Sequence, residues 1–143
     1  MNIRKMRKED IGFVYSICDK EPYFQVSPNF HGVWSKEQLG TWIASEEDVL
    51  LVAEELGEIM GFIMIAHHKP TGKSTIENMW VSEEHRKKGI AQKLFDEGIR
   101  ELKTKGSNYV CAMADKENSN MLNFLQKNGA DKGHLFYWRG KGI

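Results

Sequence analysis

Apolar residues recur along this chain with two different spacings, and each spacing predicts a different kind of element. Apolar positions three or four residues apart indicate helices with one face turned to a core. The predicted helices are 9–20, 35–43, 90–105 and 118–127. Short apolar runs bounded by turn residues indicate strands. The predicted strands are 2–6, 49–53, 59–66, 75–81, 109–113 and 135–138.

Polar and glycine-containing segments separate these elements where boundaries are expected. Ser35 and Gln38 have the spacing of a capping box, in which each side chain binds the backbone amide of the other residue. Segments 56–57 and 69–72 predict turns between strands. The order of strands and helices favours an α/β or α+β arrangement around one mixed sheet. At 143 residues, the chain suits a single domain that spans 1–143.

The composition is that of an ordinary globular protein, and it narrows the classes of function. Hydrophobic residues make up 41% of the chain and charged residues 28%. Lys plus Arg and Asp plus Glu each number 20, and a formal net charge of zero argues against nucleic-acid or membrane-surface partners. No apolar run approaches the ~20 residues that span a bilayer, and the start lacks the apolar core of a signal peptide. We therefore expect a cytoplasmic protein in which Cys18 and Cys111 are reduced and buried.

Segment 86–91, with the sequence RKKGIA, lies between a predicted strand and a predicted helix and carries the strongest chemical signal. A helix N-terminus presents backbone N–H groups and a partial positive charge, and Gly89 lets a ligand approach the backbone closely. Such a loop binds phosphate or pyrophosphate, and Lys87 and Lys88 add attraction for a polyanion. On spacing alone, a solvated basic turn that caps a helix explains the segment equally well.

The same segment resembles the acetyl-CoA signature of the GNAT superfamily of N-acetyltransferases, R/Q-x-x-G-x-G/A. The predicted order of elements is similar to the whole GNAT fold over nearly the entire chain. Asn118, Phe124 and Gly129 are spaced like a later motif of the family, although Ala130 stands where the family usually has Phe. The resemblance implies a mixed, mostly antiparallel central sheet flanked by about four helices.

This resemblance also implies roles for particular positions. The strand before the loop would pair with the pantetheine arm of acetyl-CoA like an added strand. The residues of that strand are Met79, Trp80 and Val81. The loop and the helix start would hold the pyrophosphate through backbone amides. These amides belong to Lys87, Lys88, Gly89, Ile90, Ala91 and Gln92. Asn118 would bind near the thiol end of the coenzyme, and Arg86 would anchor the loop.

Acyl transfer to an amine requires a group that removes a proton, because an ammonium has no lone pair. The family often places a Tyr acid where this chain has Leu125, and some relatives place a Glu base where it has Met113. The remaining candidate base is Glu77, which in an unbroken strand shares a face with Met79 and Val81. A solvent-facing strand carboxylate is the alternative interpretation. Tyr137 is a weaker candidate for the acid, and a core or edge aromatic is its alternative.

The segment 21–34 is unusually aromatic for a loop, and in the family this connection lines the acceptor site. Its aromatic residues are Tyr23, Phe24, Phe30 and Trp34. They suit an apolar group or a cationic amine, although a loop packed on the core by its own aromatics is an equal alternative. The histidines show no metal-binding spacing, so no metal is expected. His67 and His68 are interpreted as surface residues, with a position facing the acceptor site at a strand end as the alternative.

The leading hypothesis is transfer of an acetyl group from acetyl-CoA, as co-substrate, to a primary amine on a small molecule by direct attack in a ternary complex. Acetylation of a protein N-terminus or lysine is a close alternative. A CoA-binding regulatory module without catalysis is an alternative of another class, which the missing Tyr and Glu leave open. The sequence does not identify the acceptor amine or the acyl length, and it leaves a homodimer open.

Overall fold

The computed structural model describes residues 1–25 and 34–133. The chain divides into two compact units, Met1–Met113 and a smaller unit from Ala114 onward, and each is described by itself. The predicted strand 135–138 lies outside the described residues. In the part of the chain that the structure describes, no helix is both long and apolar enough to cross a membrane.

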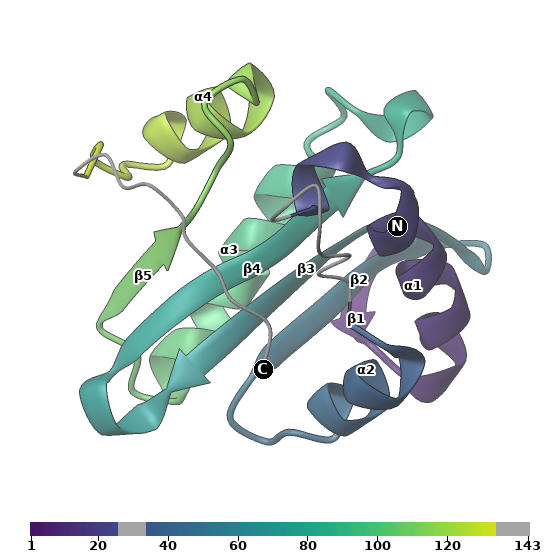
Figure 1. The fold of residues 1–143 in the computed structure, drawn as a ribbon, viewed down its shortest axis with the longest axis horizontal. Coiled ribbons are helices and arrows are strands. Elements are labelled where there is room, and N and C mark those ends of the chain that lie inside the picture. The colour runs from purple at the N-terminus through teal and green to yellow at the C-terminus, as the bar shows by residue number, and fades with distance from the viewer. Residues whose placement is uncertain (26–33, 134–143) are drawn as a thin grey trace. The chain divides into compact units, whose positions relative to one another are not determined.

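The first unit is built on one five-stranded sheet with the order β1-β2-β3-β4-β5 (Figure 1). The strands are β1 Asn2–Lys5, β2 Val49–Glu55, β3 Glu58–His68, β4 Lys73–Val81 and β5 Tyr109–Ala112. The first four strands pair antiparallel, and β4 and β5 pair parallel. The mixed, mostly antiparallel sheet expected from the sequence is therefore confirmed.

The helices are α1 Ile11–Lys20, α2 Lys36–Ile43 and α3 Ile90–Thr104 in the first unit, and α4 Ser119–Lys127 in the second. Short 3₁₀ turns are η1 Lys8–Asp10, η2 Pro22–Phe24, η3 Lys69–Thr71 and η4 Glu83–His85. The start of α2 confirms the predicted capping box. The Gln38 amide donates to Ser35 Oγ at 3.1 Å, and the Ser35 amide donates to Gln38 Oε1 at 2.8 Å.

Two layers of helices cover the sheet, one on each face (Figure 1). On one face, alternate residues of β2 and β3 form a buried cluster with residues of α1 and α2. This cluster contains Met6, Val14, Cys18, Leu39, Leu50, Val52, Phe62 and Met64. On the other face α3 lies close to β3, because a Cβ added at Gly98 would lie 2.9 Å from Ile65 Cδ1. The alternation of β3 therefore decides which residues of its neighbour β4 face each helical layer.

A β-bulge interrupts β4 at Glu77. Asn78 pairs with Met64, whereas Ile76 pairs with the next residue of β3, Ile65, so Glu77 is the extra residue. In an unbroken strand Glu77 would pair with Ile65, but Ile76 takes that position instead. The period-two argument that put Glu77 on the face of Met79 is therefore wrong across the bulge.

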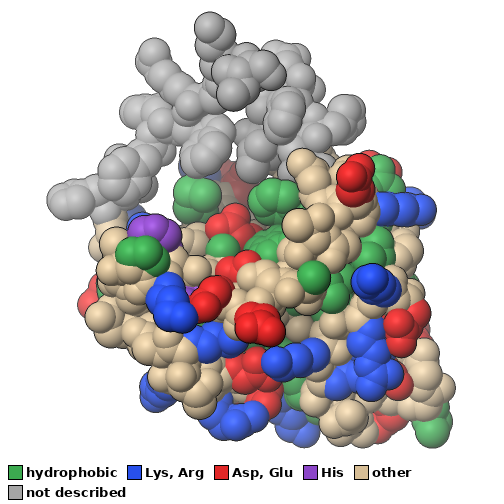
Figure 2. All heavy atoms as spheres, turned by 90° about the horizontal axis from the view of Figure 1, so that it is seen from below, with side chains coloured by type: hydrophobic (Ala, Val, Ile, Leu, Met, Phe, Trp, Pro, Cys, Tyr) green, Lys and Arg blue, Asp and Glu red, His purple; other side chains and the backbone are tan. Residues whose placement is uncertain are grey.

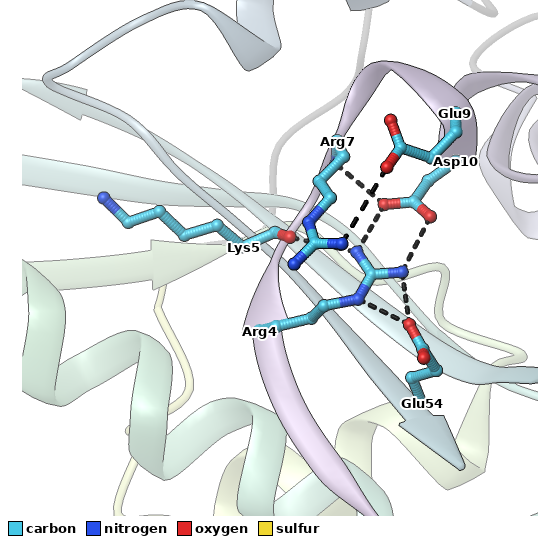
Figure 3. Close-up of polar contacts among 6 residues, drawn as sticks. All are labelled: Arg4, Lys5, Arg7, Glu9, Asp10 and Glu54. Atoms are coloured by element: carbon cyan, nitrogen blue, oxygen red, sulfur yellow. Dashed lines mark hydrogen bonds and ion pairs between the residues drawn. The ribbon is translucent and has the colours of Figure 1, made fainter. Parts of the chain in front are cut away.

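A polar network joins β1, η1 and β2 (Figure 3). The Arg4 guanidinium binds both carboxylate oxygens of Asp10, at 2.7 and 2.9 Å, and also binds Glu54. Asp10 is 4% exposed, and burial alone would raise its pKa. Hydrogen bonds from Arg4 and from the Arg7 amide outweigh burial and hold the pKa of Asp10 below its ordinary value. Periodicity cannot predict this network, because it joins residues far apart in the sequence.

Two side chains expected from the sequence lie in different surroundings from those predicted. The interpretation of His67 as a surface residue is wrong: it is 8% exposed, and Ser74 Oγ lies 2.9 Å from its Nδ1. Cys18 and Cys111 are both free thiols, but Cys111 is only half-buried. Burial raises the pKa of the Cys18 thiol to about 12, which leaves it protonated at neutral pH.

Candidate functional site

The chain reverses direction between the end of β4 and the start of α3 through two residues with left-handed backbone. Lys87 has φ 60° and Gly89 has φ 79°. Gly89 precedes the first helical residue, Ile90, and as a glycine it has no side chain that could cap this helix start. The first bond across the helix start runs from the Lys93 amide to the Gly89 carbonyl at 3.1 Å. The amides of Gly89, Ile90 and Ala91 precede that bond and lie where a helix presents donors.

The surroundings of Gly89 leave room for a ligand. A Cβ added at this glycine would meet no atom within 4 Å, whereas one added at Gly61 would lie 2.7 Å from the Trp80 carbonyl oxygen. Lys87 and Lys88 are exposed on the same loop. A helix start with amides, positive side chains and open space binds a phosphate group, because the dipole and the charges act together.

Arg86 ties this loop to the strand before it. Its Nε donates to the Val81 carbonyl oxygen at 3.1 Å, and its Nη1 lies 3.6 Å from Glu83 Oε1. Ser82 Oγ lies 2.7 Å from His85 Nδ1 and braces the intervening turn. The contacts agree with the anchoring role that the sequence suggested for Arg86.

Among the described residues of Met1–Met113, no strand pairs with the half of β4 nearest the loop on the side away from β3. Pairing with β5 ends at Ile76 and Ala112, so β5 does not pair with the rest of β4. The Ser82 amide donates to the Met60 carbonyl at 2.9 Å. This bond shows which amides of the preceding strand residues point toward β3 and which point away. Because donors point to alternate sides of a strand, the amides of Met79 and Val81 point away from β3. Both features fit an extended arm and a pyrophosphate on one ligand.

Aromatic residues gather where α1 and η2 meet β3 and β4. Trp80 stacks on the buried Phe62 at 5.8 Å and meets the half-exposed Phe13 edge-on at 5.9 Å. Phe24 also packs on Phe62, at 6.3 Å between ring centroids. Tyr23 remains 49% exposed. The structure thus brings Phe24 and Trp80 into one aromatic cluster and leaves Tyr23 at its margin.

Trp34 reaches β4 from the segment before α2. Its Nε1 donates to Asn78 Oδ1 at 3.2 Å, and its ring meets Trp42 edge-on at 5.1 Å. This hydrogen bond places Trp34 beside the bulge that contains Glu77. Asn78 was missed at the sequence level, because only the bulge and the packing of segment 34–35 bring it to this position.

The pKa of Glu77 is shifted in the opposite direction to the lowered pKa values of Asp10, Glu47, Glu55 and Glu97. Its side chain is exposed, yet partial desolvation by surrounding protein raises its pKa, and the negative charge of Asp48 raises it further. A carboxylate with a raised pKa is a better proton acceptor than an ordinary one. Such shifts are typical of functional sites and support Glu77 as a candidate base.

Three predicted site residues are not described together with this part of the first unit. Phe30 and Tyr137 lie outside the described residues. Asn118 belongs to the second unit, where its Oδ1 accepts from the Met121 amide at 3.1 Å and caps α4. Its role toward the coenzyme stays a prediction.

Two hollows in the described residues lie elsewhere. One, of about 410 Å³, is lined in part by Lys5, Ile43 and Asp48, and the other, of about 450 Å³, by His67 and Lys73. Neither is lined by a residue of 86–92. Within the described ranges, no cluster of His, Cys, Asp and Glu suits a metal ion. Figure 2 shows cationic and anionic side chains interspersed on the face seen there.

Comparison with known proteins places this geometry in a family. Residues 15–130 match the model of the acetyltransferase (GNAT) family. Among curated protein sequences, none matches this chain.

Solved structures with the same fold include several N-acetyltransferases. The aminoglycoside acetyltransferase HMB0005 from an uncultured soil metagenomic sample is 17% identical, with a TM-score of 0.76 over 99% of this chain and 98% of that one. The PaiA N-acetyltransferase from Thermoplasma acidophilum, solved with coenzyme A, is 22% identical, with a TM-score of 0.75 over 89% and 87%. The ribosomal-protein-S18-alanine N-acetyltransferase from Escherichia coli is 17% identical, with a TM-score of 0.68 over 90% and 76%. The match of the family model over most of the sequence shows that this chain belongs to the GNAT acetyltransferase family.

Proposed function

We propose that this protein transfers an acetyl group from acetyl-CoA to a primary amine on a small molecule. The observation that carries the proposal is the uncapped start of α3 beside the open edge of β4. Membership of the GNAT family supplies the reaction class, and these two features support a coenzyme site at this edge of the sheet.

In this proposal, backbone groups hold the coenzyme. Loop and helix amides from Lys87 to Gln92 bind the pyrophosphate, and the side chains of Lys87 and Lys88 add charge attraction. The backbone of Met79 and Val81 holds the pantetheine arm and the thioester carbonyl along β4, beside the backbone of Trp80. Backbone recognition suits a ligand that many different sequences of this family must bind. Asn118 is proposed to bind near the thiol end.

The amine is proposed to enter from the aromatic side of β4. Glu77 accepts a proton from the ammonium, which frees the nitrogen lone pair. The nitrogen bonds to the acetyl carbon while the Met79 amide donates to the carbonyl oxygen, and the C–S bond then breaks. The thiolate leaves with the electron pair and takes up the second proton of the attacking nitrogen, which yields a neutral amide and a free thiol. A thiol is acidic enough to leave without an enzyme acid. Tyr137 is retained as a candidate acid.

Phe24, Trp34 and Trp80 all pack against the buried cluster on one face of the sheet, and Trp34 also donates to Asn78, the residue after Glu77. A small-molecule acceptor is proposed because these aromatic side chains suit the body of a compact amine. Tyr23 and Phe30 are proposed to complete this side. Structural neighbours that acetylate aminoglycosides support the same class. A protein N-terminus or lysine as acceptor, and coenzyme binding without catalysis, are the outcomes against which the experiment is designed.

Two measurements test the proposal. Titration calorimetry with coenzyme A measures binding, and we expect one site per chain. Release of free thiol from acetyl-CoA is then followed with spermidine, kanamycin, tryptamine and a peptide that begins with alanine. Turnover with one of the three small amines supports the proposal. Turnover with the peptide alone indicates a protein acetyltransferase, and binding without turnover indicates a regulatory module.

A further inference from the structure

The hydrogen bond between Trp34 and Asn78 joins segments that lie 44 residues apart in the sequence. Asn78 is half-buried on β4, in register with Met64 of β3, whose side chain belongs to the cluster under α1 and α2. Asn78 therefore lies on the aromatic side of the sheet. It also directly follows the bulged residue Glu77, so a change at Asn78 acts beside the proposed base.

Trp34 is held from two directions. Its ring packs against Trp42 of α2 at 5.1 Å between centroids, and its indole N–H reaches Asn78 Oδ1 at 3.2 Å. The first contact fixes the ring on the helix, and the second fixes its rotation relative to β4. An indole N–H that loses its acceptor in a half-buried position would turn toward solvent, because a buried unpaired donor is costly. The Asn78 side chain thus selects one orientation of Trp34.

We infer that Asn78 is a positioning residue that sets the affinity for the acceptor amine by holding Trp34 against β4 next to Glu77. This inference rests on the proposed function, because it assigns Trp34 to the wall of the acceptor site. Asn78 acts through the indole. Its backbone points toward β3 and leaves the coenzyme edge to Met79 and Val81. Its replacement should therefore change recognition of the amine and spare recognition of acetyl-CoA.

The test compares Asn78→Leu, Trp34→Phe and the double variant, using the best acceptor among spermidine, kanamycin and tryptamine. Asn78→Leu removes the acceptor oxygen, and Trp34→Phe removes the indole N–H. We expect each single variant to raise the KM for the amine about threefold to tenfold, as for the loss of one hydrogen bond. The KM for acetyl-CoA should stay within about twofold. The double variant should resemble either single variant, because both changes break the same contact.

Controls separate positioning from a general effect on the fold. Asn78→Asp keeps the acceptor oxygen and should restore much of the amine affinity. Asn2→Leu makes the same exchange on the exposed strand β1 and should leave both KM values unchanged. The Trp34 indole signal in a ¹H–¹⁵N spectrum, identified by its loss in Trp34→Phe, should shift in Asn78→Leu without any substrate.

The outcomes separate this inference from the proposed function. An unchanged amine KM in Asn78→Leu, or additive effects in the double variant, overturns the role of Asn78 and leaves the proposed function intact. A wild-type protein that binds coenzyme A but acetylates no amine overturns the proposed function and this inference with it. An indole signal that does not shift removes the hydrogen bond on which the inference rests.

Discussion

Two regions of the first unit differ in whether their polar groups have partners within the protein. Where β1, η1 and β2 meet, Arg4 is bound by Asp10 and Glu54, and the Arg7 amide completes the shell of Asp10 (Figure 3). Where β4 meets α3, the residue before the helix is Gly89, which has no capping side chain, and β5 does not pair with the end of β4. In the first region the charged groups bind one another, whereas in the second backbone N–H groups at the end of β4 point away from β3 and can bind a ligand.

The pKa directions of two carboxylic acids express the same difference. Asp10 titrates below its ordinary pKa because hydrogen bonds from Arg4 and Arg7 outweigh burial. Glu77 titrates above its ordinary pKa because of partial desolvation and the charge of Asp48. A carboxylate with cationic partners stabilises a fold, whereas one with a raised pKa is suited to exchange protons. The comparison predicts stability effects in one region and effects on ligand or rate in the other.

Asp10→Asn should have the largest effect, and it should act on stability. Removing one charge from a buried pair leaves Arg4 under-compensated, and we expect a loss of about 3 kcal/mol in the free energy of unfolding. Because the folded pKa of Asp10 is lowered, its contribution is present above the unfolded pKa of about 3.9 and is lost as pH falls through the folded value. Urea unfolding at pH 7 and pH 3 measures both effects. Asp19→Asn, at an exposed site, should change stability by less than about 0.5 kcal/mol.

Glu77→Gln should instead lower activity at nearly constant stability. Loss of a general base reduces kcat/KM by about 100-fold or more. The raised pKa of Glu77 means that wild-type activity falls, as pH decreases, at a higher pH than an ordinary Glu would give. The loss in the variant should be greatest at low pH and shrink toward the pKa of the amine. A pH–rate profile of Glu77→Gln that runs parallel to the wild type would exclude Glu77 as the base, and Glu58→Gln serves as the matched control.

Gly89→Val should weaken coenzyme A binding by roughly 10-fold to 100-fold. A β-branched residue is strained at φ 79°, and its side chain would enter the space that Gly89 leaves open. Calorimetry measures the dissociation constant. Ser35→Ala provides the comparison at a capped helix: it should cost about 1 kcal/mol of stability and leave the affinity for coenzyme A unchanged. Equal affinities in the two variants would remove the contrast between the helix starts.

Lys87→Gly should have the smallest effect. Glycine accepts the left-handed backbone at this position, so the variant removes the charge without adding strain. We expect the dissociation constant for coenzyme A to rise about threefold at low salt, with a smaller difference at 0.5 M salt, since screening weakens the attraction. An effect that does not depend on salt would indicate that Lys87 acts through loop shape.

Local signals in the sequence predicted much of the fold. Helical spacing indicated α1, α2, α3 and α4, and apolar runs indicated the strands of the described sheet within a few residues. The capping box at Ser35 and Gln38 was confirmed with both of its hydrogen bonds. These features depend on residues close together in the chain, which is why spacing alone can find them.

Features that depend on contacts with another strand or helix were missed or wrongly predicted from the sequence. His67 lies next to the polar turn 69–72, which suggested an exposed position. It is buried instead, and its Nδ1 lies 2.9 Å from Ser74 Oγ. The bulge at Glu77 shifts the alternation of β4, which no pattern in that strand announces. Asn78 looks like an ordinary strand residue until Trp34 is seen to donate to it.

The sequence alone determined that a helix start with a glycine, two lysines and a small residue within six positions follows a strand, and it predicted phosphate binding there. It also determined the family through that segment and the order of the elements. The tertiary structure decided which polar groups have partners within the described residues and which are left to bind a ligand. Arg4, Asp10 and Glu54 come from three elements and satisfy one another, whereas β5 ends before β4 does. Hydrogen-bond partners across a sheet depend on register and strand length, and these are properties of the packed chain rather than of any one segment.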